Sequence, residues 1–206
     1  MPAIESTVMP PVKIDPMKLP GPWADGYVLE RQHTLTSDFV GHDSFGNPQF
    51  DTKRSELGEL VFRLKNRSDK STLDSIAETA VEFIKGWNPS FDLIVPVPPS
   101  RKRTYQPVVE IAAAIGARLS KAMNAAAVRK MAETPELKNV FDYQERLKLL
   151  QGAFEVDGSA VAGRRILLVD DLYRSGATAT VVAQALLSGN AAAVHMLAMT
   201  KTRTRT

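Results

Sequence analysis

Two adjacent carboxylates, Asp170 and Asp171, stand between an apolar stretch and a loop of small and hydroxyl residues in the run RRILLVDDLYRSGATATVVAQALL. The loop that follows contains Arg174, Ser175, Gly176, Ala177 and Thr178. Small residues let a backbone approach an anion closely, and a helix that begins here would offer unpaired N–H groups and the positive end of its dipole. We therefore expect this loop to bind a single phosphate group.

The carboxylates before the loop need a different partner. A phosphate held by the loop would repel them, so they must face sugar hydroxyls or a Mg²⁺ ion that bridges to the ligand. A sugar phosphate would satisfy both halves of the motif. The run is neither a Walker A loop, since no Gly-Lys-Ser/Thr follows, nor a dinucleotide fingerprint, since it holds a single glycine. The alternative is that Asp170 and Asp171 only cap the following helix.

The elements that would position this motif alternate along the chain. Apolar residues at helical spacing predict helices near residues 57–64, 73–84, 108–119, 142–150 and 177–187. Short apolar runs predict strands near residues 26–35, 91–98, 125–130, 166–171 and 191–199. This alternation predicts an α/β fold, with a mostly parallel open sheet flanked by helices. Ligands bind beyond the carboxyl ends of such strands, where Asp170 and Asp171 would lie.

Composition excludes several other classes of function. The net charge of +3 suits a phosphorylated ligand but falls short of the basic stripe of a nucleic-acid binder. The chain has no cysteine, which excludes disulfides and thiolate zinc sites, and its three histidines do not share metal-ligand spacing. It has no apolar run of transmembrane length, and its proline-rich start lacks the apolar core of a signal peptide. We therefore expect a cytoplasmic protein with no membrane partner.

The motif carries a resemblance to a known family. ILLVDDLYRSGAT resembles the phosphoribosyl pyrophosphate (PRPP) signature of type I phosphoribosyltransferases, with four apolar residues, two acidic ones and a Thr/Ser-Gly-x-Thr loop. The stretches LVFRLKNRSD, LIVPVPPSRKRTYQP and ERLKLLQGAFEV are similar to the ComF-like branch, so that the likeness spans Ser55 to Lys201. The N-terminal zinc ribbon of that branch is missing, because it needs cysteines.

The resemblance implies roles for named residues. Asp170 and Asp171 would contact the ribose hydroxyls, and Mg²⁺ only indirectly through ribose or water, while Arg174–Thr178 would hold the 5′-phosphate. The pyrophosphate loop would comprise Pro99, Ser100, Arg101, Lys102 and Arg103, although such a basic turn can also be merely solvated. Three further cations could reach the leaving pyrophosphate or could be ordinary surface charges: Arg129, Lys130 and Lys138.

The implied reaction is the displacement of pyrophosphate from PRPP by an acceptor that the sequence does not identify, with Mg²⁺ as cofactor and a homodimer as the assembly. Arg174 stands where hypoxanthine-type salvage enzymes carry an acidic residue. Since arginine cannot accept a proton, hypoxanthine or guanine salvage is disfavoured. The alternative is a non-catalytic PRPP- or nucleotide-binding protein, or a ComF-like protein associated with DNA uptake. The tail cations Lys201, Arg203 and Arg205 leave room for nucleic acid, but charged chain ends are usually only solvated.

The N-terminal part departs most from the family pattern. We divide the chain into a proline-rich arm (residues 1–22), a hood-like β and turn segment (23–54) and a phosphoribosyltransferase-like domain (55–206). Relatives use a variable hood to recognise the acceptor, and the aromatic side chains available for stacking are those of Tyr27, Phe39 and Phe45. Polar turn residues in the same segment could contact a ligand or belong to ordinary surface loops: Asp38, His42, Asp43 and Asn47. RTYQP replaces the ComF-like RGFNQ, so Tyr105 either stacks on a ligand or packs in the core, and Pro107 suits a first helical turn.

Overall fold

A computed structural model describes residues 10–99, 104–131, 140 and 142–202 of the chain. Its main sheet has six strands in the order β1-β2-β10-β9-β5-β6, and all neighbours are parallel except β1 and β2. The strands are β1 (Met17–Lys18), β2 (Asp25–Glu30), β5 (Leu93–Pro96), β6 (Ala122–Met123), β9 (Arg165–Tyr173) and β10 (Ala193–Lys201). The predicted α/β fold with a mostly parallel sheet is confirmed.

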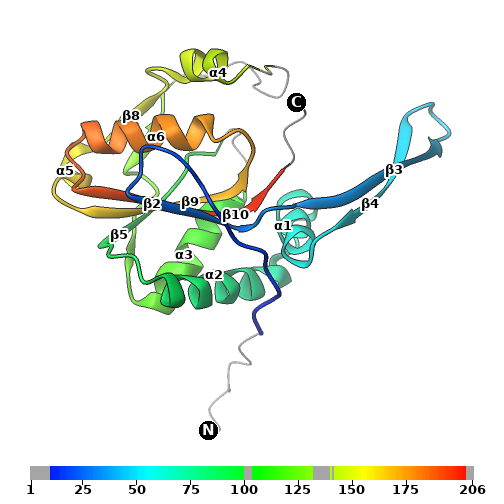
Figure 1. Cartoon of the computed structure of the whole chain (residues 1–206), viewed down its shortest axis with the longest axis horizontal. Helices are drawn as coiled ribbons and strands as arrows, with labels where there is room; N and C mark the ends of the chain where they lie inside the picture. The colour runs from blue at the N-terminus through cyan, green and yellow to red at the C-terminus, as the bar shows by residue number, and fades with distance from the viewer. Residues whose placement is uncertain (1–9, 100–103, 132–139, 141, 203–206) are drawn as a thin grey trace, which may run out of the picture.

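Helices cover both faces of this sheet, as Figure 1 shows. One face packs against α1 (Glu56–Arg67), α2 (Leu73–Trp87) and α3 (Pro107–Leu119), and the other packs against α6 (Ala177–Ser188). The shorter α4 (Tyr143–Leu150) lies over α6, and α5 (Gly158–Val161) precedes β9. A 3-10 turn, Lys70–Thr72, joins α1 to α2. Pro107 is the first residue of α3, as predicted, because its missing N–H has no helical partner there.

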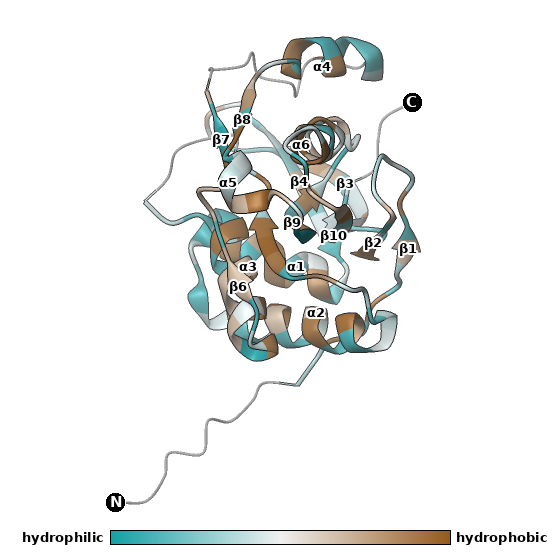
Figure 2. Cartoon of the chain, turned by 90° about the vertical axis from the view of Figure 1, so that its left-hand side faces the viewer, coloured by the Kyte–Doolittle hydropathy of each residue, from teal (hydrophilic) through white to brown (hydrophobic). Residues whose placement is uncertain are grey.

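Strand β9 explains why its sequence is a continuous aliphatic run. Ile166 and Leu168 belong to the core cluster on the α6 side, whereas Leu167 and Val169 belong to the cluster on the side of α1, α2 and α3. Successive side chains of a strand point to opposite faces, so a strand buried on both faces must be apolar at every position. The hydrophobic residues concentrate along the sheet and the helices beside it (Figure 2).

A second, smaller ribbon lies apart from the main sheet. Strands β7 (Val128–Lys130) and β8 (Phe154–Val156) pair in antiparallel fashion. The predicted strand near residues 125–130 therefore exists, but it pairs with β8 instead of the main sheet. In the main sheet, the strand beside β5 is instead β6. It has only two residues and no apolar run from which it could be predicted.

The N-terminal region differs from its predicted division. β2 pairs in parallel with β10, so the first strand of the hood-like segment belongs to the main sheet and does not stand apart from it. The rest forms a hairpin of β3 (Thr34–His42) and β4 (Pro48–Arg54), which projects from the body of the molecule (Figure 1). Residue 10 onward of the arm lies against α2, where the Val12 amide donates to Thr79 Oγ1 at 3.0 Å. None of the described helices combines the length and apolar character needed to span a lipid bilayer.

Candidate functional site

The acidic pair lies at the carboxyl end of β9, between β10 and β5. Asp170 pairs with Ala198 of β10, and the Val97 amide that follows β5 donates to the Val169 carbonyl at 2.8 Å. The pair does not cap α6, because the N-cap residue of that helix is Gly176 and both aspartates lie within β9. The capping alternative is therefore wrong, and the carboxylates stand free of that helix at the sheet edge where α/β folds bind ligands.

Asp171 forms an ion pair with Lys65 in the last turn of α1. The Lys65 Nζ lies 2.8 Å from each of the two carboxylate oxygens, and the Asp171 side chain is only 10% exposed. Strand alternation sends Asp171 to the same side as Leu167 and Val169, which is the side that α1 covers. Our reading of the sequence missed Lys65. It lies within the ComF-like stretch LVFRLKNRSD, but nothing in its local pattern links it to a residue so distant along the chain.

Asp170 has a different electrostatic environment. Burial is the main cause that raises the pKa of its carboxyl to about 7, and the charge of the adjacent Asp171 raises it further. The charge of Lys65 opposes this shift only in part. Removal from water disfavours the charged form of an acid, and a neighbouring carboxylate does the same. The two aspartates therefore differ in role, since Asp171 is paired with a cation while Asp170 retains a proton into the neutral range.

A buried polar chain supports the acidic pair from behind. His33 Nδ1 lies 3.0 Å from Thr200 Oγ1, and the Thr200 hydroxyl donates to the Asp171 carbonyl at 3.5 Å. Burial, together with the charges of Arg54 and Lys65, lowers the pKa of His33 to about 4. His33 is therefore neutral at neutral pH, and it links the start of the hairpin to the strand that carries the carboxylates.

The loop after β9 is shaped by Gly176 and Tyr173. Gly176 has φ +82°, and a Cβ added to it would lie 2.0 Å from the Tyr173 hydroxyl oxygen. Only glycine adopts this backbone freely and leaves room for the buried Tyr173 ring. Ser175 lies directly before the glycine, and its Oγ accepts weakly from the Ala177 amide at 3.4 Å. The first turn of α6 thus opens onto a tight loop of small residues, as the phosphate-site prediction requires.

Arg146 of α4 reaches the same loop. Its Nη1 donates to Ser175 Oγ at 2.8 Å, its Nε donates to the Val140 carbonyl, and the residue is 6% exposed. The Tyr143 hydroxyl lies 3.2 Å from Thr180 Oγ1 and joins α4 to α6. Our reading of the sequence placed a helix here but gave Arg146 no role, although ERLKLLQGAFEV carried part of the family resemblance.

The remaining predicted ligands are only partly placed. Pro99 follows β5 at the same sheet edge, whereas Ser100, Arg101, Lys102, Arg103 and Lys138 lie outside the described residues, as do Arg203 and Arg205 of the tail. Lys130 is the last residue of β7 and Lys201 the last of β10. Arg129 is exposed on β7, where its charge contributes to lowering the pKa of Asp157. A contact of these residues with pyrophosphate stays a prediction.

The aromatic residues of the hood-like segment do not gather at the acidic pair. Tyr27 packs edge-on against Phe83 and Trp87 of α2, with ring centroids 5.4 and 5.2 Å away, and a stacking role on a ligand stays a prediction. On the hairpin, Phe39 packs against Phe50, and Phe45 at the tip is 88% exposed. Tyr105 packs against the core beneath α1, α2 and α3, with Lys70 Nζ 4.8 Å from its ring centroid, which favours its packing alternative.

The acidic pair does not form a metal centre by itself. In the described part of the chain, no group of three or more His, Cys, Asp or Glu side chains could hold a metal ion. Both Asp171 oxygens already face Lys65. Mg²⁺, however, commonly keeps several waters and is bound through substrate phosphates with one or two carboxylates. A Mg²⁺ ion that the ligand carries, with the acidic pair in contact through ribose or water, therefore stays a prediction.

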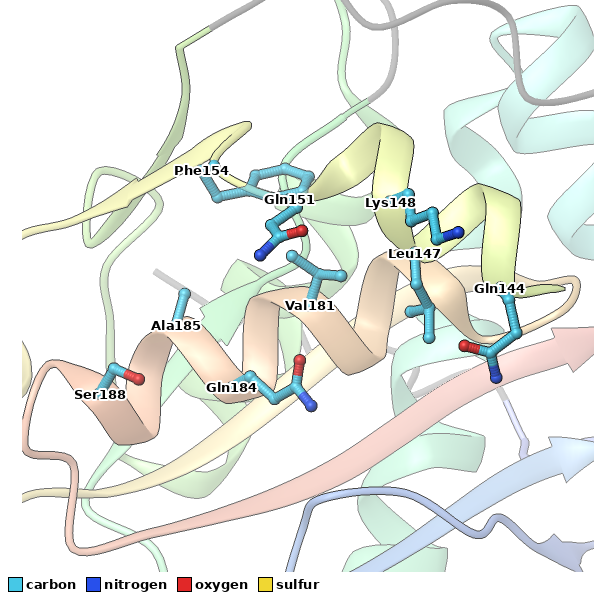
Figure 3. A pocket seen from close by; sticks show the side chains of 10 residues that line it. Gln144, Leu147, Lys148, Gln151, Phe154, Val181, Gln184, Ala185 and Ser188 are labelled. Atoms are coloured by element: carbon cyan, nitrogen blue, oxygen red, sulfur yellow. The ribbon is translucent and has the colours of Figure 1, made fainter.

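Two cavities lie away from this edge. A groove of about 380 Å³ between α4, β8 and α6 is lined by side chains such as Leu147, Phe154 and Val181 (Figure 3). This groove lies on the face of α6 opposite to Val182 and Leu186, whose side chains pack on the sheet. A second cavity of about 680 Å³ lies between the arm and α2, beside Tyr27 and Trp87. The acidic pair lines neither of these two cavities, and Lys65 contacts the Asp171 carboxylate directly.

No protein-family model matches the chain, and no curated protein matches it. Among solved structures, it is similar to an allosteric regulatory enzyme of purine biosynthesis, with 14% identity over 73% of this chain and a TM-score of 0.48. It is also similar to adenine phosphoribosyltransferases from Thermoanaerobacter pseudethanolicus (17% identity, 79% of this chain and 95% of that chain, TM-score 0.44) and Leishmania tarentolae (13%, 85% and 91%, 0.45). The chain covers 33% of the length of the regulatory enzyme. The ComF-like branch stays a prediction.

Proposed function

We propose that this protein is a phosphoribosyltransferase, which binds PRPP with Mg²⁺ at the carboxyl end of β9 and transfers the phosphoribosyl group to an acceptor. The observation that carries the proposal is the position of the acidic pair. Asp170 and Asp171 lie near the carboxyl end of β9, a strand buried on both faces, and α6 begins after the short loop that follows this strand. A ribose diol can face the carboxylates while its 5′-phosphate faces the amides of Arg174–Thr178.

The two carboxylates would act on the ribose in different ways. Lys65 orients the Asp171 carboxylate, which accepts hydrogen bonds from the ribose hydroxyls. Asp170, whose pKa is raised to about 7, can at neutral pH donate a hydrogen bond to a ribose hydroxyl when protonated or accept one from it when ionised. Carboxylates beside the ring also stabilise the positive charge that develops on an oxocarbenium-like transition state.

The reaction balances without an oxidant or a further reactant. The bond between the anomeric carbon and pyrophosphate breaks, and pyrophosphate leaves with the bonding electrons. A nucleophilic atom of the acceptor forms the new bond to the same carbon and loses its proton. Mg²⁺, when bound, neutralises the departing pyrophosphate. We propose that Pro99, which follows β5, and residues 100–103 bind the pyrophosphate.

Pyrophosphate release tests this function. The protein is incubated with Mg²⁺, PRPP and a panel of purines, pyrimidines and related amides, beside an Asp170→Asn/Asp171→Asn variant. A matched control carries Asp43→Asn/Asp51→Asn, of which Asp43 is half-buried at the hairpin turn and Asp51 is exposed on β4. Turnover that is lost in the first variant and kept in the second supports the proposal.

Two other results would point elsewhere. Tight PRPP binding without pyrophosphate release for any acceptor favours a non-catalytic binding protein, and salt-sensitive affinity for single-stranded DNA would link it to nucleic acid. The absence of both turnover and PRPP binding would overturn the proposed function.

A further inference from the structure

Arg146 stands out among the arginines of the molecule by its burial. Within residues 10–99, 104–131, 140 and 142–202, it is the one arginine that is buried, with an exposed fraction of 6%. Its two hydrogen-bond acceptors are the Ser175 hydroxyl and the Val140 carbonyl. Both are neutral groups, so no described carboxylate balances the charge of the guanidinium.

The other described arginines follow a different pattern. Five of them form ion pairs with carboxylates: Arg31, Arg54, Arg63, Arg118 and Arg165. Those for which the described residues show no ion pair are exposed to water: Arg67, Arg129, Arg164 and Arg174. A charged side chain is tolerated in either situation, because a counterion or water solvates it. Arg146 has neither.

The surroundings of Arg146 make its buried positive charge unfavourable in free energy. Burying an unpaired charge is unfavourable, because neutral hydrogen-bond acceptors replace only part of the lost hydration. Burial lowers the pKa of the Arg146 guanidinium, and the charge of Arg174 lowers it further. Two like charges therefore lie close together beside the start of α6, where the helix dipole is also positive. An anion at Ser175 would relieve all three unfavourable interactions.

We propose that Arg146 binds the phosphate monoester of the ligand together with the Arg174–Thr178 loop, so that α4 supplies part of the phosphate site. The identity of the ligand rests on the proposed function, but the contact with a phosphate group does not depend on any transfer reaction. Guanidinium groups bind phosphate through paired N–H donors, and Arg146 presents its donors to the Ser175 hydroxyl. The site selects a phosphorylated sugar over the same sugar without its phosphate.

Thermal unfolding with a simple anion tests this contact. Wild type, Arg146→Gln and Arg146→Lys are unfolded with and without inorganic phosphate and ribose 5-phosphate, with chloride keeping the ionic strength constant. We expect both phosphates to raise the Tm of wild type, and Arg146→Gln to lose this rise. Affinity for ribose 5-phosphate should fall by about tenfold or more in Arg146→Gln, with partial recovery in Arg146→Lys. Ribose should raise the Tm of none of them.

A second arginine provides the matched control. Arg165 lies at the opposite end of β9, is 46% exposed and is paired with Asp92 at 2.6 Å. Arg165→Gln should keep the full phosphate-dependent rise in Tm, whatever its own stability. Without phosphate, Arg146→Gln should be at least as stable as wild type, since it removes an unbalanced buried charge.

The other possible outcomes distinguish the Arg146 inference from the proposed transferase function. An equal loss of Tm in Arg146→Gln with and without phosphate would make Arg146 a purely structural contact and overturn the inference, as would an unchanged phosphate response or none in wild type. PRPP turnover with equal PRPP affinity in wild type and Arg146→Gln would overturn the inference and leave the proposed function intact. A phosphate response that depends on Arg146, in a protein that neither binds nor turns over PRPP, would support the inference and overturn the proposed function.

Discussion

The end of β9 and the tip of the hairpin contain similar residues in very different surroundings. Both have a glycine with positive φ, Gly176 at +82° and Gly46 at +79°. At the end of β9, Tyr173 packs over the glycine and Lys65 pairs with Asp171. At the hairpin tip, the donors to the Asp43 carboxylate that the described residues show belong to its own turn, such as the Phe45 amide at 2.8 Å. We therefore expect ligand binding at the end of β9, where residues from distant parts of the chain meet. The hairpin tip has similar residue types, but within the described part of the chain they contact only their own turn.

Removing one carboxylate from each region should give the largest contrast. Asp171→Asn should weaken PRPP binding roughly 100-fold, because it removes the charged ribose acceptor that Lys65 orients at the end of β9. Asp43→Asn should leave PRPP binding unchanged. Isothermal titration calorimetry in the presence of Mg²⁺ measures both. Equal effects in the two variants would show that the comparison between the regions is wrong.

Adding one methyl group to each glycine separates packing from backbone strain. Gly176→Ala should lower the free energy of unfolding by roughly 2–4 kcal/mol, since the new Cβ overlaps Tyr173 and the left-handed backbone is strained. Gly46→Ala adds a similar strain, but no described atom lies within 4 Å of its Cβ, so we expect a loss of about 1 kcal/mol. Urea denaturation measures both values. A larger loss for Gly46→Ala would contradict the model of the loop.

The dependence of stability on pH tests the environment of Asp170. Its pKa is raised from 3.8 to about 7 in the folded protein, so between these values the folded state holds a proton that the unfolded state has lost. The free energy of unfolding should therefore fall as pH rises through this range. His33 acts in the opposite direction between about 4 and 6.5, because its pKa is lowered in the folded protein.

The comparison of Asp170→Asn with wild type cancels the contribution of His33. The variant should gain stability relative to wild type as pH rises from 3.8 to 7. Urea denaturation at several pH values measures this difference. A constant difference across the range would show that Asp170 titrates normally.

The smallest effect is expected for the exposed tip of the hairpin. Phe45→Ser should change the free energy of unfolding by no more than about 0.5 kcal/mol, because the side chain is 88% exposed and buries little surface on folding. PRPP binding should not change either. A clear loss of PRPP or acceptor binding in calorimetry would instead return Phe45 to the acceptor-recognising role first considered for it.

Patterns within short stretches of sequence predicted much of the fold. The helices α1, α2, α3, α4 and α6 lie where apolar spacing placed them. β9 lies where four consecutive aliphatic residues predicted a strand, and it includes the acidic pair near its carboxyl end. These features depend on residues within a few positions of one another. β6 escaped prediction, because a two-residue strand has no period of its own.

Contacts between distant segments could not be predicted in this way. β2 was assigned to a hood-like segment but joins the main sheet beside β10, far along the chain. Tyr27 was one of three aromatic residues considered available for stacking on a ligand, and it lies in that strand and packs against α2. In the sequence, an aromatic residue in a strand looks the same whether it lines a site or fills a core, since only its neighbours in space distinguish the two.

The sequence by itself determined the chemistry of the motif: a buried strand, two carboxylates and a loop of small residues before a helix, all in one continuous run. Only the tertiary structure decided which cations meet that run. Lys65 comes from α1 and Arg146 from α4, and each arrives through the packing of its helix against the sheet or against α6. Local propensities act over a few residues, whereas burial and charge pairing act across space, so the partners of Asp171 and Ser175 became visible only in the fold.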